Sequence, residues 1–587
     1  DQDYDGSHIK GLLINLIHAW WPSLARLPNF VREFFTPIVK ATRGKEKISF
    51  YTMPEYEKWK EETDNGKGFR IKYYKGLGTS EAKEAKEYFS AIASHTLSYK
   101  YEGVRDDQMI DLAFNKKKAD DRKEWINGYE EGSLVDHTQK EVTYSDFVNK
   151  ELVLFARYNV VRMIPSLIDG FKPSQRKVIF GCFKRKLKND CKVAQLTGYV
   201  SEHAAYHHGE SSLQETIIGM AQDFVGSNNV NLLVPQGQFG TRLQGGKDSA
   251  SARYIYTRLA PVARLIFKEE DDNILDYIRE DGMKIEPTWY CPVIPMVLVN
   301  GAEGIGTGWS TLIPNYNPKE IIANLRRFLK GQEMQMMTPW YQGFKGSIVE
   351  TKSEKGKYDV TGVINVDPND SAKATITELP VKKWTQDYRE LLEDNLPKGE
   401  KKKADATKLL EEYAEYHTEQ TVNFELALSA EGQRRAEAGT LDRAFKLHSS
   451  VTTSNMMLFN EQGRIQKYDT VLDVLREFAD VRLRMYDKRK AFLVARLTKE
   501  CEVLSAKARF IKLVVEGRLK IKRRKILDLV ADLRKLGFKP LEAVKGKSDK
   551  GGDGDGDGDE EEEAGAGDGD GGDGDGDGES GEAAEGE

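Results

Sequence analysis

Residues 1–21, DQDYDGSHIKGLLINLIHAWW, decide how the first part of the chain folds. The alternation in DQDYD is typical of the end of a β-strand, and the residues that follow it have helical periodicity. Apolar side chains share one helical face there, at Ile9, Leu12, Leu13, Leu16 and Ile17. Strand-like and helical segments continue through EFFTPIVKA (33–41) and ISFYTMPEY (48–56), so we expect a mixed α/β unit over residues 1–110.

Three acidic residues precede the predicted helix, namely Asp1, Asp3 and Asp5. In a strand they would point to one side, and carboxylate oxygens are ligands that Mg²⁺ prefers. An EF-hand loop begins in a similar way, but its twelfth position must be a bidentate Glu and here it is Leu12. A solvated turn is equally compatible with the residue types, yet the apolar helix directly after Gly6 favours a ligand site.

The middle of the chain changes pattern twice. Residues 111–144 contain the basic segment KKKADDRKEW and are expected to form a linker. Over residues 145–285, short helical segments such as QRKVIFGCFKR alternate with Gly-rich turns, which predicts a small helical domain with a wing. Over residues 286–400, short β-rich runs such as KATITELPV, separated by Gly, Pro and Asn, predict a second α/β unit.

Residues 401–540 are expected to be mainly helical. Apolar or aromatic residues recur every seven positions at Leu472, Ala479, Tyr486 and Leu493, which predicts one long helix over residues 470–515. Charged residues at Lys490, Glu500 and Lys507 interrupt the apolar stripe. The interruption favours an antiparallel hairpin with an earlier helix, at about residues 402–417, over a parallel zipper.

The end of the chain, residues 541–587, is a low-complexity acidic segment of Gly, Asp and Glu, and we expect it to be disordered. Residues 551–587 contain 17 acidic residues and no basic ones, which leaves 88 basic against 77 acidic residues, a net charge of +11, in residues 1–550. That surplus suits a polyanionic partner, although a solvated surface would give the same count.

Other features of the composition exclude several classes of protein. The four cysteines lack C-x-x-C spacing, which disfavours a zinc site or a disulfide framework. No run of about 18 uncharged apolar residues is present, so we expect no membrane span. The chain starts at Asp1 with no leader-like segment, so we expect it to be the interior of a longer polypeptide.

The segment ARYIYT (252–257) places two tyrosines, Tyr254 and Tyr256, after Arg253. A phenol has a pKa of about 10 and is a weak nucleophile at neutral pH, so a catalytic tyrosine needs a base or a metal and cationic donors for the attacked phosphate. Arg253 could be such a donor, because a guanidinium matches phosphoryl oxygens in a fork. In an extended segment both tyrosines share one face, so alternation does not choose between them, and with 25 tyrosines in the chain a packing role is also open.

Two further segments carry candidate groups. DGFKPSQRKVIFGCFKRKLK presents Arg176 and Lys177 at a predicted helix start, and AAYHHGESS presents His207 and His208 in a polar turn. Each alone could be a solvated face, but together they suggest a site. NGAEGIGTGW lacks the G-x-G-x-x-G spacing and GKS at 546–548 lacks the first glycine of a P-loop, so no nucleotide triphosphate site is predicted.

Several of these strings together identify a family. DQDYDGSHIKGLLIN, KYYKGLGTS, DDRKEW, IPSLIDGFKPSQRKV, YHHGE, DFVGSNNVNLL, GQFGTRLQGGKDSASARYIYT and LVNGAEGIGTGWST occur in order. They closely resemble the breakage-reunion core of eukaryotic DNA topoisomerase II, from residue 1 to about 540. The resemblance implies a partial TOPRIM α/β unit, a winged-helix DNA-cleavage domain, a β-rich tower domain, and a long antiparallel coiled coil with a C-terminal dimer gate.

The resemblance also implies a reaction and its residues. Each protomer of a homodimer would cut one strand of double-stranded DNA with Mg²⁺, through Tyr254 as nucleophile and Arg253 as transition-state stabiliser. Arg176 and His208 would be further phosphate-side and proton-handling groups. Asp1, Asp3 and Asp5 would bind the metal.

DNA contacts follow from the same matching of motifs. They are Arg122, Lys123, Lys172, Tyr206, Ser212 and Trp384, with Ile305 as the apolar wedge that enters a base step and bends the duplex. The resemblance implies a nuclear protein without a membrane partner, for which KIKRRK (520–525) is a weak additional signal.

The family's catalytic glutamate and its ATP-hydrolysing domain are expected upstream of Asp1, so ATP would be used by the complete protein and its site would not be in this chain. This chain is then expected to bind DNA and dimerise but to cleave poorly. A non-catalytic, chromatin-organising DNA-binding dimer is the alternative. The bacterial gyrase type is disfavoured because it divides the aspartate and tyrosine regions between two polypeptides.

Overall fold

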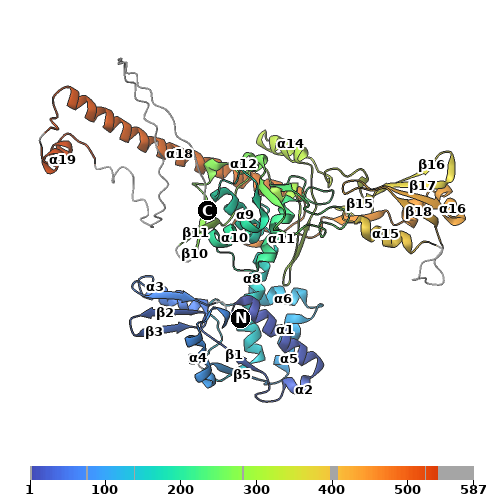
Figure 1. Ribbon diagram of the computed structural model, residues 1–587, viewed down its shortest axis with the longest axis horizontal. Coiled ribbons are helices and arrows are strands. Elements are labelled where there is room, and N and C mark those ends of the chain that lie inside the picture. Colours follow the sequence, from blue (N-terminus) through green and yellow to red (C-terminus); the bar gives the residue numbers. More distant parts are fainter. Residues whose placement is uncertain are drawn as a thin grey trace, which may run out of the picture. The chain divides into compact units, whose positions relative to one another are not determined.

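The computed structural model describes residues 3–74, 77–137, 139–280, 283–396, 408–522 and 524–539 (Figure 1). The chain forms two compact units, residues 1–492 and 493–587. Asp1 and the acidic segment 541–587 lie outside the described residues, as does the first part of the helix expected at 402–417. Among the described residues, no helix combines the length and the apolar character that a bilayer span requires.

The first helix, α1 (Tyr4–Trp20), begins where a strand was expected. Asp3 is its N-cap, and the Asp3 Oδ1 atom accepts a hydrogen bond of 2.8 Å from the Gly6 N–H. A carboxylate at this position satisfies a backbone donor that the helix itself leaves unpaired, so the predicted strand end is wrong for residues 3–5. Asp3 and Asp5 therefore lie at the start of a helix and not on one side of a strand.

The helix itself was predicted correctly, but its buried face was not. The buried residues of α1 are Ser7, Gly11 and Ile14, whereas Ile9 and Leu13 are 56% and 57% exposed. A Cβ atom at Gly11 would lie 3.0 Å from Phe114 and 3.2 Å from Leu152. The helix thus packs through its small residues, because these allow its backbone to approach the neighbouring elements closely.

One mixed and one antiparallel sheet complete this part of the chain, which confirms the predicted mixed α/β class. One sheet has the order β1-β5-β6 and the other β3-β2-β4. The strands are β1 (Arg32–Phe34), β2 (Val39–Arg43), β3 (Glu46–Phe50), β4 (Arg70–Tyr73), β5 (Thr96–Lys100) and β6 (Glu141–Thr143). The helices are α2 (Pro22–Ala25), α3 (Met53–Glu62), α4 (Ala82–Ser90), α5 (Val104–Phe114) and α6 (Ala119–Asn127), with short 3₁₀ turns η1 (Leu77–Thr79) and η2 (Ile92–Ser94).

Residues 111–144 are not a linker. They contain the end of α5, all of α6, and β6, which pairs in parallel with β5. The first three lysines of KKKADDRKEW lie in the short turn between α5 and α6, and the rest of the segment belongs to α6. The chain then continues through α7 (Tyr144–Asp146), the π-helical turn η3 (Phe147–Leu152) and α8 (Val153–Met163).

The next part contains three helices and a small sheet, which fits the expected helical domain with a wing. The helices α9 (Pro173–Lys184), α10 (Val193–His203) and α11 (Glu210–Ala221) pack on one another. The sheet has the order β7-β9-β8, from β7 (Cys191–Lys192), β8 (Leu233–Gln236) and β9 (Tyr256–Leu259). After it come α12 (Pro261–Ile266), η4 (Glu269–Asp271), and the hairpin of β10 (Tyr277–Glu280) and β11 (Met283–Pro287).

The predicted boundary at residue 285 does not separate two cores. The short helix α13 (Met296–Val299) is buried in the same core as α9, α10 and α11. The hairpin of β12 (Ala302–Ile305) and β13 (Ser310–Ile313) and the helix α14 (Pro318–Leu329) follow it. The core therefore runs across the expected domain limit.

The β-rich region, at the right of Figure 1, extends past its predicted end at residue 400. Its sheets have the orders β14-β15-β20 and β16-β17-β19-β18. The strands are β14 (Ser347–Glu350), β15 (Lys357–Thr361), β16 (Val363–Asp367), β17 (Asp370–Glu378), β18 (Leu410–Glu415), β19 (Phe424–Leu428) and β20 (His448–Thr452), and the helices are α15 (Thr385–Glu393), α16 (Ala430–Glu437) and α17 (Leu441–Ala444). Residues 410–415 were expected to be helical, but they pair with β19 as a strand.

A long helix, α18 (Val471–Val515), confirms the prediction for residues 470–515. It follows the hairpin of β21 (Met456–Phe459) and β22 (Ile465–Tyr468), and Val474, Leu475 and Phe478 in its first part are buried in the core of the first unit. In the second unit the chain turns back through α19 (Ile526–Lys535), so that the Phe538 ring lies 6.5 Å from that of Phe510. The part of the chain that contacts the end of α18 thus follows it in the sequence, and the earlier helix expected at 402–417 is a strand at residues 410–415.

Candidate functional site

A charged cluster lies at the start of α1 and joins three distant segments. The Arg162 Nη1 atom donates to both Asp5 carboxylate oxygens, at 2.8 and 3.2 Å. His208 Nδ1 is 3.4 Å from Asp5 Oδ2 and 3.4 Å from Arg162 Nη1. The Tyr158 hydroxyl is 2.7 Å from His208 Nε2. The structure thus brings together two predicted residues, Asp5 and His208, and adds two that were not predicted.

The two additional residues, Tyr158 and Arg162, are four positions apart on α8. That spacing puts them on the same helical face, which is the only sequence signal that could have pointed to them. Nothing in the local sequence shows that this face meets Asp5, because Arg162 and Asp5 are 157 residues apart.

The environment keeps His208 uncharged near neutral pH. Burial lowers the pKa of the His208 imidazole, and the positive charge of Arg162 lowers it further, while Asp5 acts in the opposite direction. Burial also raises the pKa of the Tyr158 phenol, which therefore retains its proton. A neutral imidazole and a protonated phenol thus lie beside an Asp–Arg ion pair.

The metal assignment has partial support from the geometry. Asp3 and Asp5 provide only oxygen donors, which suits Mg²⁺. Asp3 also caps α1, and Asp5 is paired with Arg162. Within the residues that the structure describes, no group of three or more His, Cys, Asp and Glu side chains could hold a metal ion. The third predicted ligand, Asp1, lies outside them.

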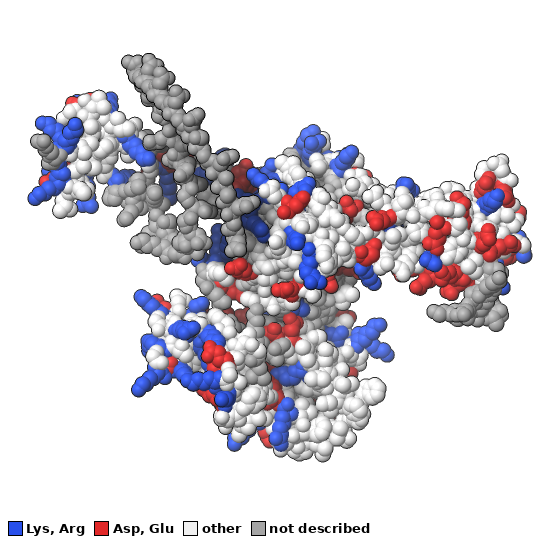
Figure 2. Space-filling model, in the orientation of Figure 1, with Lys and Arg blue, Asp and Glu red and all other residues white. Residues whose placement is uncertain are grey.

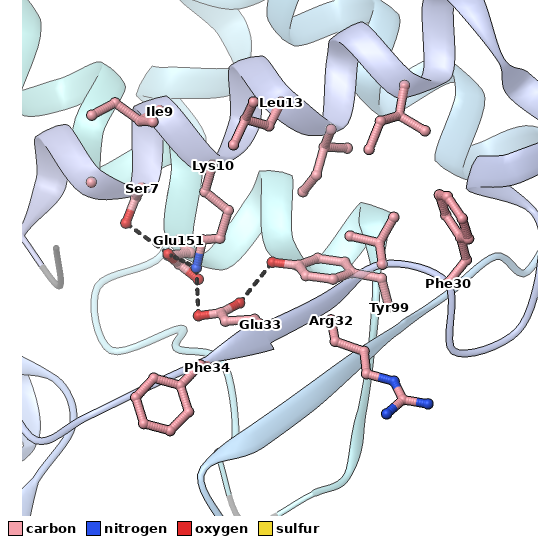
Figure 3. A pocket seen from close by; sticks show the side chains of 14 residues that line it. Ser7, Ile9, Lys10, Leu13, Phe30, Arg32, Glu33, Phe34, Tyr99 and Glu151 are labelled. Atoms are coloured by element: carbon pink, nitrogen blue, oxygen red, sulfur yellow. Dashed lines mark hydrogen bonds and ion pairs between the residues drawn. The ribbon is translucent and has the colours of Figure 1, made fainter. Parts of the chain in front are cut away.

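A second polar cluster holds the first turns of α1 in place (Figure 3). The Ser7 hydroxyl donates to Glu151 at 2.6 Å, and Lys10 Nζ lies 2.6 Å from carboxylate oxygens of both Glu33 and Glu151. The Tyr99 hydroxyl donates to Glu33 at 2.8 Å. These groups border a cavity of about 460 Å³ and satisfy one another, so their role is to position the helix that carries Asp3 and Asp5.

The two candidate tyrosines occupy different backbone environments. Tyr254 lies in a turn, where its N–H donates to the Ser251 carbonyl at 2.9 Å, and its side chain is 72% exposed. Tyr256 is the first residue of β9 and pairs with residues of β7 and β8. The expectation that they share a face therefore fails, because only Tyr256 belongs to a strand. Arg253 is also exposed, with its guanidinium 6.0 Å from the centroid of the Tyr254 ring.

Backbone hydrogen bonds fix the Tyr254 turn to the start of α10. The N–H of Val193 donates to the Ile255 carbonyl and that of Ala194 to the Ala252 carbonyl, both at 3.1 Å. Ala252 and Ile255 are buried, so the backbone on both sides of the exposed Tyr254 is held in place.

His208 belongs to the opposite end of the same helix. It follows the last residue of α10, and the nearby Tyr206 N–H donates to the Ser201 carbonyl in the last turn at 3.2 Å. The 11 residues of α10 span about 16 Å. Among the described residues, no hydrogen bond or ion pair connects Tyr254 or Arg253 with the Asp5 cluster.

Arg176 is placed differently from the prediction. Its side chain is buried, and its guanidinium donates to both carboxylate oxygens of Asp169, at 2.7 and 3.0 Å. Asp169 is completely buried and also accepts from the backbone N–H groups of Phe171 and Tyr290. This arrangement shows an internal ion pair that holds α9, whereas a group that binds phosphate would be expected at the surface.

The predicted wedge lies at the tip of the β12–β13 hairpin. Ile305 is 76% exposed there. A Cβ atom at Gly304 would lie 2.0 Å from the Met163 carbonyl oxygen, so this glycine allows the hairpin to lie directly on α8. A Cβ atom at Gly308 would lie 3.4 Å from Lys123, which places the loop beside α6.

Four other predicted DNA contacts have partners within the protein. Arg122 donates to the Leu112 and Asn115 carbonyls at the end of α5, and Lys123 Nζ is 2.7 Å from Asp120. Tyr206 is buried, with its ring edge towards His208. The indole of Trp384 packs edge to face with the ring of Phe224, with 5.8 Å between centroids.

The remaining two lie at helix starts. Ser212 is exposed in the first turn of α11. Lys172 is the N-cap residue of α9. Burial lowers the pKa of its ammonium group, and the carboxylate of Glu303 opposes that effect. Of the two, only Ser212 has an exposed side chain, whereas Lys172 is partly buried beside Glu303.

Charge is unevenly distributed over the face of the molecule in Figure 2. Acidic side chains gather on the β-rich region around β16, β17 and β18, whereas Lys and Arg are frequent around α3, β2 and β3. A polyanion would therefore avoid the end of the β-rich region on this face.

Comparison with known proteins gives consistent results. Residues 162–550 match the family model for the A subunit of DNA gyrase/topoisomerase IV, and residues 34–160 match the C-terminal associated domain of TOPRIM. The chain is 53% identical to DNA topoisomerase 2 of Arabidopsis thaliana over 545 residues, which is 92% of this chain and 36% of that protein. It is 49% identical to human DNA topoisomerase 2-beta over 564 residues, 94% of this chain and 34% of that protein.

A solved structure shows the same fold. The chain resembles the DNA-binding, cleavage and re-ligation domain of Plasmodium falciparum topoisomerase II with a TM-score of 0.77 and 50% identity, over 93% of this chain and 74% of that one. The chain thus spans about a third of the length of the curated relatives and most of the length of this solved domain.

Proposed function

This chain belongs to the DNA gyrase/topoisomerase IV family, with DNA topoisomerase II as its similar eukaryotic relatives, and we propose that it is the DNA-cleaving part of such an enzyme. It would cut both strands of double-stranded DNA, allow another duplex to pass, and reseal the break. The complete nuclear protein would thereby relax and decatenate DNA with ATP. The observation that carries this proposal is an exposed Tyr254 on a rigid turn beside Arg253, in a chain that also holds the Asp5–Arg162–His208 cluster.

The chemistry is a transesterification. The Tyr254 phenol oxygen attacks a backbone phosphorus, the bond from phosphorus to the 3′ oxygen breaks, and the released 3′ hydroxyl takes up one proton for the one that the phenol loses. The new 5′-phosphotyrosine bond keeps the ester's free energy, so the reverse attack reseals the strand. Arg253 compensates the growing negative charge on the phosphoryl oxygens.

Asp3 and Asp5 would hold Mg²⁺, which when bound would neutralise phosphate charge. The protein's own groups prepare that site. Arg162 fixes the Asp5 carboxylate, and the ion pairs of Lys10 fix the helix on which both acids lie. Lys123 on α6 lies beside the hairpin that carries the exposed Ile305, and the two would contact the backbone and a base step of the same duplex.

The separation of Tyr254 from the Asp5 cluster supports a homodimer. A phenol fixed at the start of α10 does not reach groups beyond the other end of a helix of about 16 Å. Tyr254 of one copy would therefore act with Asp5 and His208 of a second copy, and the DNA would lie between them.

Trapping the covalent intermediate tests this function. The complete protein is incubated with DNA and Mg²⁺ and then denatured, and the DNA attached to protein is measured. We expect none with Tyr254→Phe and an adduct with Tyr256→Phe, since Tyr256 is held in a strand. An adduct that persists with Tyr254→Phe would overturn the proposal.

A further inference from the structure

We propose that Arg242 is a positioning residue for the reaction, because its buried ion pair with Glu378 makes the β-rich region hold the loop that leads to Tyr254. The inference rests on the proposed function, in which Tyr254 is the nucleophile. The Arg242 Nη2 atom donates to Oε1 of Glu378, the last residue of β17. Both side chains are buried, with 6% and 1% of their surface exposed. Arg242 therefore acts through the protein and not on DNA directly.

The loop of residues 238–250, which contains Arg242, is closed on itself by hydrogen bonds. The Ala250 N–H donates to the Gln238 carbonyl at 2.9 Å, which joins the two ends of the loop. Within the loop, Asp248 accepts from the Thr241 N–H at 2.9 Å and from the Thr241 hydroxyl at 2.5 Å. The loop is thus a compact body that would move as a whole.

The Tyr254 turn begins directly after this loop. The Tyr254 N–H donates to the carbonyl of Ser251, the first residue past the loop, at 2.9 Å. The next residue, Ala252, is buried and accepts from the N–H of Ala194 in α10. A shift of the loop would therefore move the residue on which the Tyr254 turn is built.

The ion pair connects the loop to a fixed point of the β-rich region. The Glu378 carboxylate also accepts from the backbone N–H groups of Leu379 at 3.0 Å and Lys345 at 3.1 Å. Three donors thus hold the carboxylate, and two of them belong to the backbone of the segments around β14 and β17. The guanidinium of Arg242 is anchored where that carboxylate is.

The helix α15 of the β-rich region starts on the same loop. The N–H of Gln386, in the first turn of α15, donates to the Leu243 carbonyl at 3.0 Å, so the loop satisfies a donor that the helix leaves unpaired. A Cβ atom at Gly245 would lie 2.3 Å from the indole of Trp384, the N-cap residue. The absence of a side chain at Gly245 lets the loop and the helix start approach closely.

These contacts favour a single arrangement of the loop against the β-rich region. A buried ion pair contributes little net stability, because both charges lose their hydration. Separating the partners is costly, however, because each would remain buried without its counter-charge. The pair between Arg242 and Glu378 therefore excludes arrangements in which the loop is displaced. Since a misplacement of about 1 Å can lower a rate about 100-fold, Arg242 supports the reaction through the position of Tyr254.

The test compares Arg242→Met and the milder, isosteric Glu378→Gln with the control Arg482→Met. Arg482 also forms a buried ion pair, with Asp271 at 2.6 Å, but this pair joins α18 to η4 and not to the loop. The first measurement is the hydrogen exchange of backbone amides in the complete protein without DNA. It is made by mass spectrometry at a temperature at which every variant is folded.

We expect faster exchange in residues 238–254 with Arg242→Met, a smaller increase with Glu378→Gln, and no change there with Arg482→Met. The second measurement is DNA relaxation by the complete protein. Arg242→Met should lower kcat roughly 10- to 100-fold with an unchanged KM for DNA, because the nucleophile is misplaced while the DNA contacts remain.

Several outcomes would overturn the proposal. Unchanged exchange with both Arg242→Met and Glu378→Gln would show that the ion pair does not hold the loop. An equal increase with Arg482→Met would show a general loss of stability. An unchanged kcat despite faster exchange would remove the link to Tyr254, and a raised KM with unchanged kcat would make Arg242 a determinant of DNA binding.

The two measurements separate this inference from the proposed function. Hydrogen exchange needs no cleavage, so it tests the attachment of the loop alone. If exchange changes as expected but no DNA is ever linked to Tyr254, the proposed function fails and the attachment of the loop stands. If DNA is linked to Tyr254 but exchange does not change, the function stands and the role of Arg242 fails.

Discussion

Tyr254 and His208 lie at opposite ends of one helix. The turn that carries Tyr254 is hydrogen-bonded to Val193 and Ala194 at the start of α10, and His208 follows its last turn. The helix between them is a rigid spacer of about 16 Å. A reaction that uses both groups would, under the proposed function, draw them from two copies of the chain.

A mixing experiment checks this requirement. Complete protein with Tyr254→Phe is combined with complete protein that carries Asp5→Asn, and mixed dimers are formed. If the groups act across copies, each mixed dimer has one intact site, so we expect nicks in one strand, whereas each variant alone gives no cleavage. Mixed dimers without nicks would show that the groups act within one copy.

Replacing Arg176 should affect stability more than DNA binding. Arg176→Met leaves the fully buried Asp169 without its guanidinium, and breaking such a buried pair costs about 3–5 kcal/mol of unfolding free energy. The control is Arg258→Met, which breaks the exposed pair with Asp190 and should cost about 1 kcal/mol or less. Denaturant unfolding measures both. An unchanged stability with lost DNA affinity would restore Arg176 to the phosphate-binding role.

The wedge hairpin depends on a glycine at its base. Gly304→Ala places a Cβ atom 2.0 Å from the Met163 carbonyl oxygen, so the hairpin must move, at a cost of about 1–3 kcal/mol of stability. Gly198→Ala in α10 meets no atom within 4 Å and should stabilise by about 0.5–1 kcal/mol. Thermal unfolding measures the loss of stability with Gly304→Ala and the gain with Gly198→Ala. Energy transfer between fluorophores at the DNA ends should show reduced DNA bending with Gly304→Ala and unchanged bending with Gly198→Ala.

One ion-pair network predicts a pH dependence. Burial raises the pKa of Glu84, but hydrogen bonds from Tyr74, the Glu81 N–H and Lys72 outweigh it and lower that pKa from 4.5 to about 2. The folded state therefore gains stability that is fully present above pH 4.5 and is lost as the pH falls towards 2. Solvent screens part of this gain, because Glu84 is partly exposed.

The unfolding free energies of the protein and of Glu84→Gln are measured between about pH 5 and about pH 2, or down to the lowest pH at which the protein stays folded. We expect the two free energies to converge as the pH falls. Glu87→Gln is the control, since that carboxylate has only a 4.0 Å contact with Lys40. Parallel curves for the protein and Glu84→Gln would contradict the assignment.

The sequence predicted what depends on local periodicity. The helices α1 and α18 follow from the spacing of their apolar residues, and the mixed α/β class follows from the alternation of short runs. The other elements depend on strand pairing with residues that are distant in the sequence. LEEYAE (410–415) has a helical composition but is a strand, because β19 provides its backbone hydrogen bonds.

In the candidate site, too, the sequence did not predict what depends on long-range contacts. Alternation did not distinguish Tyr254 from Tyr256, since the turn that ends at Tyr254 is set by hydrogen bonds to α10. The basic segment around Arg176 suggested a surface, but Asp169, seven residues earlier, draws its guanidinium into the core. Tyr158 and Arg162 were missed because their partners lie 50 and 157 residues away.

Helix α8 has the wedge hairpin against it and also carries two residues of the charged cluster. Gly304 lies on the Met163 carbonyl with no side chain between them, and Tyr158 and Arg162 project from the same turns. A duplex that presses on Ile305 would thus act on the end of the helix that also carries the partners of Asp5 and His208. If Ile305 enters the duplex as proposed, the curvature of the bound DNA and the geometry of the acidic site would be coupled through α8, so a duplex that resists bending would be a poorer substrate even where every phosphate contact is made.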